Sequence, residues 1–188
     1  MTGRDLYRLL SPAFTAVRLL LTPLPSGLSR VLYELTMWIP GLPGIAIRVP
    51  LVQRLCGSCG TNPTLHHHVI VKDWARLRLG DNVQIHPFCY LDASGELSIG
   101  NDVSVAHASS MLSFEHSWDD VSLPIKYNPL RMTPVALEDD VWVGCGVRIL
   151  AGARISSRSI IAAGAVVPRG DWPSGLHAGV PARTLRSL

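Results

Sequence analysis

The chain has 188 residues, of which 47% are apolar and 16% are charged, and it contains 16 glycines and 14 prolines. This length suits one principal domain, and the composition excludes a disordered or low-complexity chain and predicts a turn-rich globular protein. The net charge of +3 is small and no Lys/Arg cluster forms a stripe, which argues against nucleic-acid binding but allows a small anionic ligand.

Residues 1–64 predict an apolar helical collar. Apolar side chains recur there at helical spacing, with arginines on the other side of the helix. The apolar residues are Leu6, Leu9, Leu10, Phe14, Val17, Leu20 and Leu21. A second apolar stretch, 31–47, is broken by Pro40 and Pro43. The sequence predicts neither a signal peptide nor a run of the roughly 18 apolar residues that span a membrane. The collar then either packs on the main domain or on a neighbouring subunit, or it anchors the protein at a membrane interface. Few Lys or Arg on its polar face favour packing.

The four cysteines predict free thiols in a reducing compartment, and hence a cytoplasmic protein that can touch the inner membrane face only peripherally. Cys56 and Cys59 form a lone Cys-x-x-Cys, whereas Cys89 and Cys145 stand apart. A zinc site needs a second pair or a spaced His pair, and a redox motif needs a βαβ context. The consecutive histidines at 66–68 point to alternate faces if they lie on a strand. No metal is expected.

A six-residue repeat dominates the rest of the chain. Every sixth residue from Leu137 is a branched aliphatic, and the position four residues later is small or β-branched. The aliphatic series is Leu137, Val143, Ile149, Ile155, Ile161 and Val167, and the compact series is Val141, Val147, Ala153, Ser159 and Ala165. The same template runs through 65–111, with two-residue slips between Leu77 and Leu79 and between Leu97 and Ile99.

A period of six is neither helical nor that of a simple alternating strand. It predicts a chain that lays a short strand, turns by about 120° and repeats, which gives a triangular prism of about five coils with the aliphatic side chains inside. Glycines at 80, 100, 144 and 164 suit the corners, where positive φ and close backbone approach are needed. The fold class is therefore mainly β, a parallel β-helix with an N-terminal helical segment.

The repeat is interrupted once. Regular spacing ends after Met111 and resumes near Leu137, so a polar segment at about 113–133 is expected to leave the solenoid as an extended loop. Loops carried on a rigid scaffold are common sites of function.

Three motifs of the second half resemble the hexapeptide-repeat acyltransferases, in particular the maltose, galactoside and exopolysaccharide O-acetyltransferases. They are DVWVGCGV at 140–147, IAAGAVV at 161–167 and AGVPAR at 178–183. The resemblance extends from Leu65 to the C-terminus and implies a left-handed β-helix at 65–180, a basic tail at 181–188, and a homotrimer with sites between neighbouring prisms. It also implies acetyl-CoA as the donor and a role in polysaccharide biosynthesis, with a saccharide or lipid-linked sugar as the acceptor.

The resemblance makes His116 the candidate catalytic residue, because the family carries a His at the start of its extended loop. Transfer of acetyl from a thioester to a hydroxyl needs a base for the hydroxyl proton, and the same group can protonate the leaving thiolate. Imidazole suits both steps near neutral pH. Glu115, Asp119, Asp120 or a backbone carbonyl can orient the ring.

Acceptor and donor positions follow from the same resemblance. His86 stands where related sugar acetyltransferases carry an acceptor-binding Asn, and Asp92 can accept a bond from a sugar hydroxyl. The compact Cys145 and Ala163 match positions along which the pantetheine arm lies, so Cys145 is expected to be a contact residue and transfer to be direct. The remaining donor residues are Trp142, Gly144, Gly164 and Gly179, with Arg169, Arg183 and Arg186 for the phosphates.

Other functions stay open at this point. The same histidine can serve an N-acetyltransferase acting on an amino sugar. A zinc-dependent hydratase of the carbonic anhydrase type shares the prism, but His86 and His107 are 21 residues apart where the coil repeat is 20. A non-catalytic scaffold has no need for the loop, His116 and the basic tail together.

Overall fold

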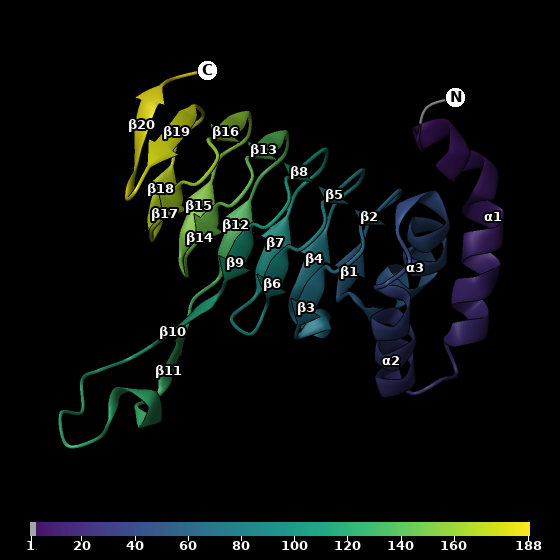
Figure 1. Ribbon diagram of the computed structural model, residues 1–188, viewed down its shortest axis with the longest axis horizontal. Coiled ribbons are helices and arrows are strands. Elements are labelled where there is room, and N and C mark those ends of the chain that lie inside the picture. Colours follow the sequence, from purple (N-terminus) through teal and green to yellow (C-terminus); the bar gives the residue numbers. More distant parts are fainter. Residues whose placement is uncertain (1–2) are drawn as a thin grey trace.

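The computed structural model describes residues 3–188 and shows three helices followed by a long prism of short parallel strands (Figure 1). The helices are α1 (Gly3–Leu21), α2 (Ser26–Thr36) and α3 (Gly41–Leu55). Residues 1 and 2 of the predicted collar lie outside the described residues. Pro40 directly precedes α3 and Pro43 lies in its first turn, where a proline is tolerated. None of the helices in residues 3–188 has the length and apolarity that crossing a membrane requires.

Three parallel sheets form the sides of the prism, here called sheets A, B and C. Sheet A contains β1 (Ser58–Cys59), β4 (Leu77–Leu79), β7 (Leu97–Ile99), β12 (Val135–Leu137), β15 (Ala153–Ile155) and β18 (Gly170–Trp172). Sheet B contains β2 (Thr64–Leu65), β5 (Gln84–Ile85), β8 (Ser104–Val105), β13 (Val141–Val143), β16 (Ser159–Ile161), β19 (Leu176–Gly179) and, antiparallel at its edge, β20 (Ala182–Arg186). Sheet C contains β3 (Ile70–Lys72), β6 (Tyr90–Asp92), β9 (Ser110–Leu112), β14 (Arg148–Ile149) and β17 (Val166–Val167). The predicted coiled, mainly β fold is confirmed.

The coil boundaries refine the domain limits expected from the sequence. β1 already pairs with β4, so the first coil begins at Ser58, before the expected start at 65. The expected basic tail at 181–188 contains β20, which pairs with β19. Short 3₁₀ turns, Trp74–Arg76 and Ile125–Tyr127, complete the elements of residues 3–188.

The six-residue repeat builds the core as expected. Each aliphatic position from Leu137 to Val167 is at most 2% exposed, and each compact position from Val141 to Ala165 is at most 1% exposed. In sheet A, Leu77 and Leu79 are both buried, with the exposed Arg78 between them. Strands β13 and β15 show the same pattern, so the two extra residues of the slip lie in the corner before β4, which contains the 3₁₀ turn Trp74–Arg76.

Close backbone approach, rather than left-handed backbone, explains three of the four corner glycines. A Cβ on Gly80 would lie 2.7 Å from the carbonyl carbon of Gly100 in the next coil. Gly100 and Gly144 face similar contacts, and only Gly164 has a positive φ, +72°. The expectation of positive φ was thus wrong for Gly80, Gly100 and Gly144. Left-handed corners fall mostly on other residues, including Asn82, Phe88, Asp102 and Asp140.

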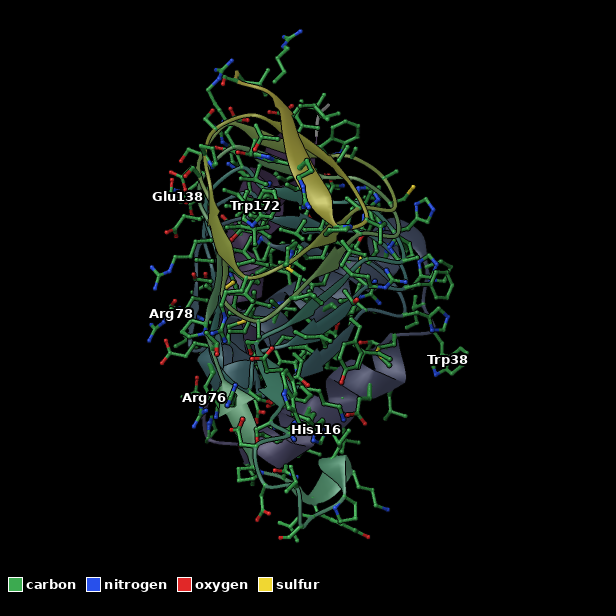
Figure 2. All side chains as sticks on the ribbon, turned by 90° about the vertical axis from the view of Figure 1, so that its left-hand side faces the viewer. Trp38, Arg76, Arg78, His116, Glu138 and Trp172 are labelled. Atoms are coloured by element: carbon green, nitrogen blue, oxygen red, sulfur yellow. The ribbon has the colours of Figure 1, made fainter. Side chains whose placement is uncertain are left out.

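Both ends of the prism are closed by large side chains. Tyr33 of α2 meets Trp74 edge-on, with ring centroids 4.8 Å apart, over the first coil. At the other end Trp172 meets the buried His177 at 5.2 Å, and Figure 2 shows Trp172 directed into the prism. Such caps are needed because a solenoid would otherwise leave apolar core exposed at its last coils.

Arg48 fastens the collar to the prism. Its guanidinium is 1% exposed and donates to the carbonyls of Leu65, Thr36 and Ile39, at 2.9, 2.5 and 3.1 Å. Burial lowers the pKa of Arg48. No carboxylate pairs with it among the described residues, so backbone dipoles alone compensate this cation.

Candidate functional site

The interruption of the repeat is a two-stranded arm. The chain leaves the prism after β9, runs out along β10 (Phe114–His116) and returns along the antiparallel β11 (Leu130–Met132) (Figure 1). Ser113 anchors the root of the arm, because its buried hydroxyl donates to the carbonyl of Asp92 at 2.7 Å and accepts from the amide of Gly95 at 2.8 Å. This arm is the extended loop expected at about 113–133.

His116 ends the first strand of the arm. It pairs with Leu130, and the following residue, Ser117, is buried and donates its amide to the carbonyl of Pro129 at 3.0 Å. The imidazole itself is exposed, with its ring centroid 6.5 Å from that of Phe114. Figure 2 shows His116 where the arm joins the prism. Within residues 3–188 the imidazole has no hydrogen-bond partner, so both ring nitrogens are available to a ligand.

The three carboxylates that can orient the ring are each engaged elsewhere. They pair as Glu115 with Arg169, Asp119 with Arg131, and Asp120 with the amide and hydroxyl of Ser122. The hydrogen bonds from Ser122 lower the pKa of Asp120. The single-chain geometry therefore assigns none of these three carboxylates to His116.

The compact donor positions line the edge between sheets B and C. Cys145 follows β13 and Ala163 follows β16, and the amide of Gly164 donates to the carbonyl of Cys145 at 2.8 Å, so the two turns stack directly. A Cβ built on Gly146 or Gly164 would meet nothing within 4 Å. The edge is therefore open on its outer side, and a thin extended ligand such as a pantetheine arm can approach its backbone.

The other predicted donor residues gather on sheet B, with one exception. Trp142 is exposed on β13, Gly144 follows that strand, and Gly179 ends β19 with φ +102°. Arg183 and Arg186 lie on β20, are exposed, and have no acidic partner among the described residues. The exception, Arg169, lies after β17 and donates to Glu115 and to the hydroxyl of Thr133 at the root of the arm.

One chain does not bring His116 and the donor edge together. His116 leaves from the corner between sheets C and A, whereas Cys145 and Ala163 lie on the corner between sheets B and C. The whole width of sheet C separates these two corners. A site that uses both groups therefore needs a second copy of the chain.

The two acceptor candidates also lie on different edges. His86 follows β5 and stacks on His66 of the preceding coil, with ring centroids 4.9 Å apart and planes 10° apart. Burial, and then the charge of His107, lowers the pKa of His86. Asp92 is 5% exposed, and its carboxylate already accepts from the amide and hydroxyl of Ser94 and from the hydroxyl of Tyr90.

His66 was considered from the sequence only as a metal ligand, and Thr133 was not predicted as part of the site. The spacing of 20 between His66 and His86 equals the coil repeat and would have predicted their stacking, whereas nothing local connects Thr133 with Arg169.

All four cysteines are free thiols, and burial raises the pKa of Cys56. Across residues 3–188, no group of three or more His, Cys, Asp or Glu side chains could hold a metal ion.

Several known proteins are similar to this chain in sequence, in fold or in both. No protein-family model matches the chain. It is 31% identical over 112 residues to a probable acetyltransferase of Mycobacterium tuberculosis, a match that covers 59% of this chain and spans only 37% of that protein. It is 30% identical over 139 residues to a putative acetyltransferase of Saccharomyces cerevisiae, covering 73% of this chain and 69% of that protein.

A third relative and a solved structure are also acetyltransferases. Galactoside O-acetyltransferase of Escherichia coli is 24% identical over 142 residues, covering 75% of this chain and 68% of that protein. A hexapeptide-repeat acetyltransferase from Vibrio cholerae, solved in complex with acetyl coenzyme A, superposes with a TM-score of 0.74 at 27% identity over 86% of this chain and 88% of that chain. The chain therefore belongs to the family of hexapeptide-repeat acetyltransferases.

Proposed function

We propose that this protein is an acetyl-CoA-dependent O-acetyltransferase that acts on a sugar hydroxyl of a saccharide or glycan precursor, with His116 as the general base. The observation that carries the proposal is the exposed, unpartnered imidazole of His116 on the two-stranded root of the arm. Family membership supports acetyl transfer, and the similarity to galactoside O-acetyltransferase supports a sugar acceptor.

In this mechanism His116 moves one proton in a direct transfer. The imidazole takes the proton of the acceptor hydroxyl as the hydroxyl oxygen bonds to the thioester carbonyl carbon. It returns that proton to sulfur as the carbon–sulfur bond breaks, so that an ester and a free thiol result. General acid–base help of this kind accelerates a reaction by about 10²–10⁴-fold.

The donor is proposed to lie along the edge between sheets B and C. The stacked turns at Cys145 and Ala163 leave the outer side of this edge open, as a pantetheine arm requires. Arg183 and Arg186 are exposed on neighbouring β20 without an acidic partner among the described residues, and guanidinium groups bind phosphate well by charge and by paired hydrogen bonds.

The working unit is proposed to be a homotrimer. Since His116 and the donor edge of one chain lie at different corners of the prism, a cyclic assembly can present the His116 of one copy to the donor edge of the next. Closed rings of three also repeat this arrangement three times without leaving an open end.

The test is thiol release from acetyl-CoA in the presence of a panel of saccharides. We expect release only with an accepted sugar, and a loss of at least about 100-fold for His116→Ala. Lys126→Ala is the matched control, because Lys126 is exposed on the same arm and stacks only on Tyr127. An unchanged rate for His116→Ala would refute the assigned base, and failure of every saccharide would refute the acceptor class.

A further inference from the structure

A cavity of about 560 Å³ lies between the collar and the outer face of sheet B, and its lining includes no residue of the arm or of the turns at Cys145 and Ala163. α1 and α3 form one wall and the first coils of sheet B form the other; Figure 1 shows both helices at this end of the prism. Small-molecule sites in proteins typically measure about 300–1,000 Å³. The space is therefore of ligand size, and it is too small for a helix of another chain.

The helical wall is apolar except for the hydroxyl of Tyr7, which accepts a hydrogen bond from Gln53. It consists of Leu6, Tyr7, Leu10 and Phe14 of α1 and Leu42, Ile45, Ala46 and Val49 of α3. The side chains of each helix recur three or four residues apart, so each helix turns one face to the cavity. From Leu6 to Phe14 that face measures about 12 Å, at 1.5 Å per residue. An apolar chain of several methylene groups can lie along it.

The sheet wall is polar. Two columns of outward side chains climb it from coil to coil: Asn62, Asn82 and Asp102, and beside them Thr64, Gln84 and Ser104. The first column is bonded internally, because the Asn62 amide donates to Asn82 at 3.1 Å and the Asn82 amide to Asp102 at 3.0 Å. The side chains of the second column make no hydrogen bond within residues 3–188, so they remain available to a ligand.

His66 adds an unused polar group to this wall. The imidazole lines the cavity, and its Nε2 atom is buried without a hydrogen-bond partner among the described residues. A buried, unpaired ring nitrogen is costly unless something bonds to it. The same ring stacks on His86, so the polar wall continues to the prism edge.

The charge of the lining limits the ligand further. Asp102 is its one ionisable acid, and it holds neither Lys nor Arg. A phosphate or sulfate would meet a carboxylate without a cation to offset it. Hydroxyl and amide groups, by contrast, match the side chains of Gln84, Ser104 and Thr64.

We propose that this cavity binds a neutral amphiphile, with its hydrocarbon chain against the collar and its hydroxylated head against sheet B. The cavity contains no residue of the arm or of the turns at Cys145 and Ala163, although His66 stacks on the acceptor candidate His86. The proposal does not depend on the acetyl-transfer function. It gives the apolar collar a ligand-binding role, because α1 and α3 form the apolar side of the cavity.

The experiment is calorimetric titration of the full chain with n-octyl β-D-glucoside below its critical micelle concentration. We expect saturable binding of this probe, no binding of glucose at the same concentrations, and weaker binding of n-octyl phosphate. Leu10→Trp should fill the cavity and weaken binding at least about tenfold, the effect of losing about two buried methylene groups. Leu9→Trp is the matched control, because Leu9 is 70% exposed on α1 and does not line the cavity.

A second variant keeps the test independent of how α1 tolerates tryptophan. Gln84→Leu should weaken octyl glucoside binding by about fivefold through one lost hydrogen bond. The ratio of the affinity for octyl glucoside to that for octyl phosphate should therefore decrease. Equal binding by Leu9→Trp and Leu10→Trp would mean that the probe coats the exposed collar, and would overturn the proposal. So would a smaller particle mass for Leu10→Trp in light scattering, because a second copy would then occupy the cavity.

Discussion

The guanidinium of Arg169 lies 3.3 Å from the carboxylate of Glu115, and this contact joins the last corner of sheet C to the root of the arm. The two side chains are 54 residues apart in the chain. Arg169 also donates to the hydroxyl of Thr133 at 3.1 Å, so a single side chain holds both strands of the arm where they leave the prism. Arg169 is thus placed to position His116, the residue next to Glu115.

Replacing Arg169 should loosen the arm without unfolding the prism. The pair is half exposed, 57% and 39%, so Arg169→Gln should lower the unfolding free energy by less than about 1 kcal/mol. Amide hydrogen exchange in β10 and β11 should become faster, whereas exchange in β14 and β17 should not. Arg154→Gln, an exposed arginine of sheet A, is the control. Unchanged exchange in the arm, together with a raised KM for acetyl-CoA, would instead favour the phosphate contact expected from the sequence.

Arg183 and Arg186 should affect the donor alone. Neither has an acidic partner among the described residues, and both are exposed, so each can be removed without structural loss. Arg183→Gln and Arg186→Gln should each raise the KM for acetyl-CoA by about tenfold, the loss of one charge-assisted phosphate contact. Steady-state kinetics with varied acetyl-CoA measures this. A fall in kcat at constant KM would contradict the assignment.

The buried aliphatic side chains stacked along sheet C should contribute strongly to the unfolding free energy. Ile149 is 0% exposed and lies between Met111 and Val167 of the neighbouring coils. Ile149→Ala should lower the unfolding free energy by about 2–5 kcal/mol, because it removes buried methyl groups and leaves a cavity. The next residue, Leu150, is 37% exposed, and Leu150→Ala should cost less than about 1 kcal/mol. Urea unfolding measures the unfolding free energy of both variants. Similar losses for Ile149→Ala and Leu150→Ala would show that the aliphatic positions of the repeat do not form the core.

The histidine pair at the collar should make stability depend on pH. Burial, and then the charges of His86, His67 and Arg48, lowers the pKa of His66 from 6.5 to about 4. Between these two values the unfolded chain binds more protons than the folded chain, so the contribution of His66 is complete above about pH 6.5 and is lost as pH falls toward about 4. Because His66 is partly exposed, we expect the loss to be about 1–2 kcal/mol.

Urea unfolding of the wild type and of His66→Gln, at about pH 7.5 and about pH 4.5, isolates this contribution. The wild type should lose more stability than the variant. His86, whose pKa is lowered too, leaves a residual dependence of the same sign in both proteins. Parallel pH profiles for the two proteins would show that His66 does not titrate as expected.

Much of the architecture could be predicted because it depends on local order along the chain. A strand directs alternate side chains inward, so Val143, Ile149 and Ile155 had to recur at a fixed spacing for each to reach the core. The arm was predictable for the same reason, since Ser113 and the residues after it break that spacing. Corner conformation was harder to predict, because Phe88 lies in the left-handed region as Gly164 does, although only glycine adopts it without steric cost.

The sequence predicts some residues of the candidate site, but not the contacts between them. The motifs around Cys145 and Ala163 predict a donor edge, and the resemblance predicts His116 at the start of the arm; both remain predictions. Arg169 was grouped with the phosphate-binding arginines, although the fold brings it to Glu115. The polar wall at Gln84 escaped notice, because its cavity exists only where α1 lies across the sheet.

By itself, the amino-acid sequence determined the prism, its aliphatic interior and the point at which the arm leaves, since each follows from which side of a short strand a residue occupies. Only the tertiary structure decided which edges the functional groups share. Along sheet A the register steps from Ser58 to Arg78, Ser98, Ala136, Arg154 and Asp171, so the coils are unequal. These unequal steps accumulate, and neighbours across coils are therefore set by the packing of the whole stack rather than by any local pattern.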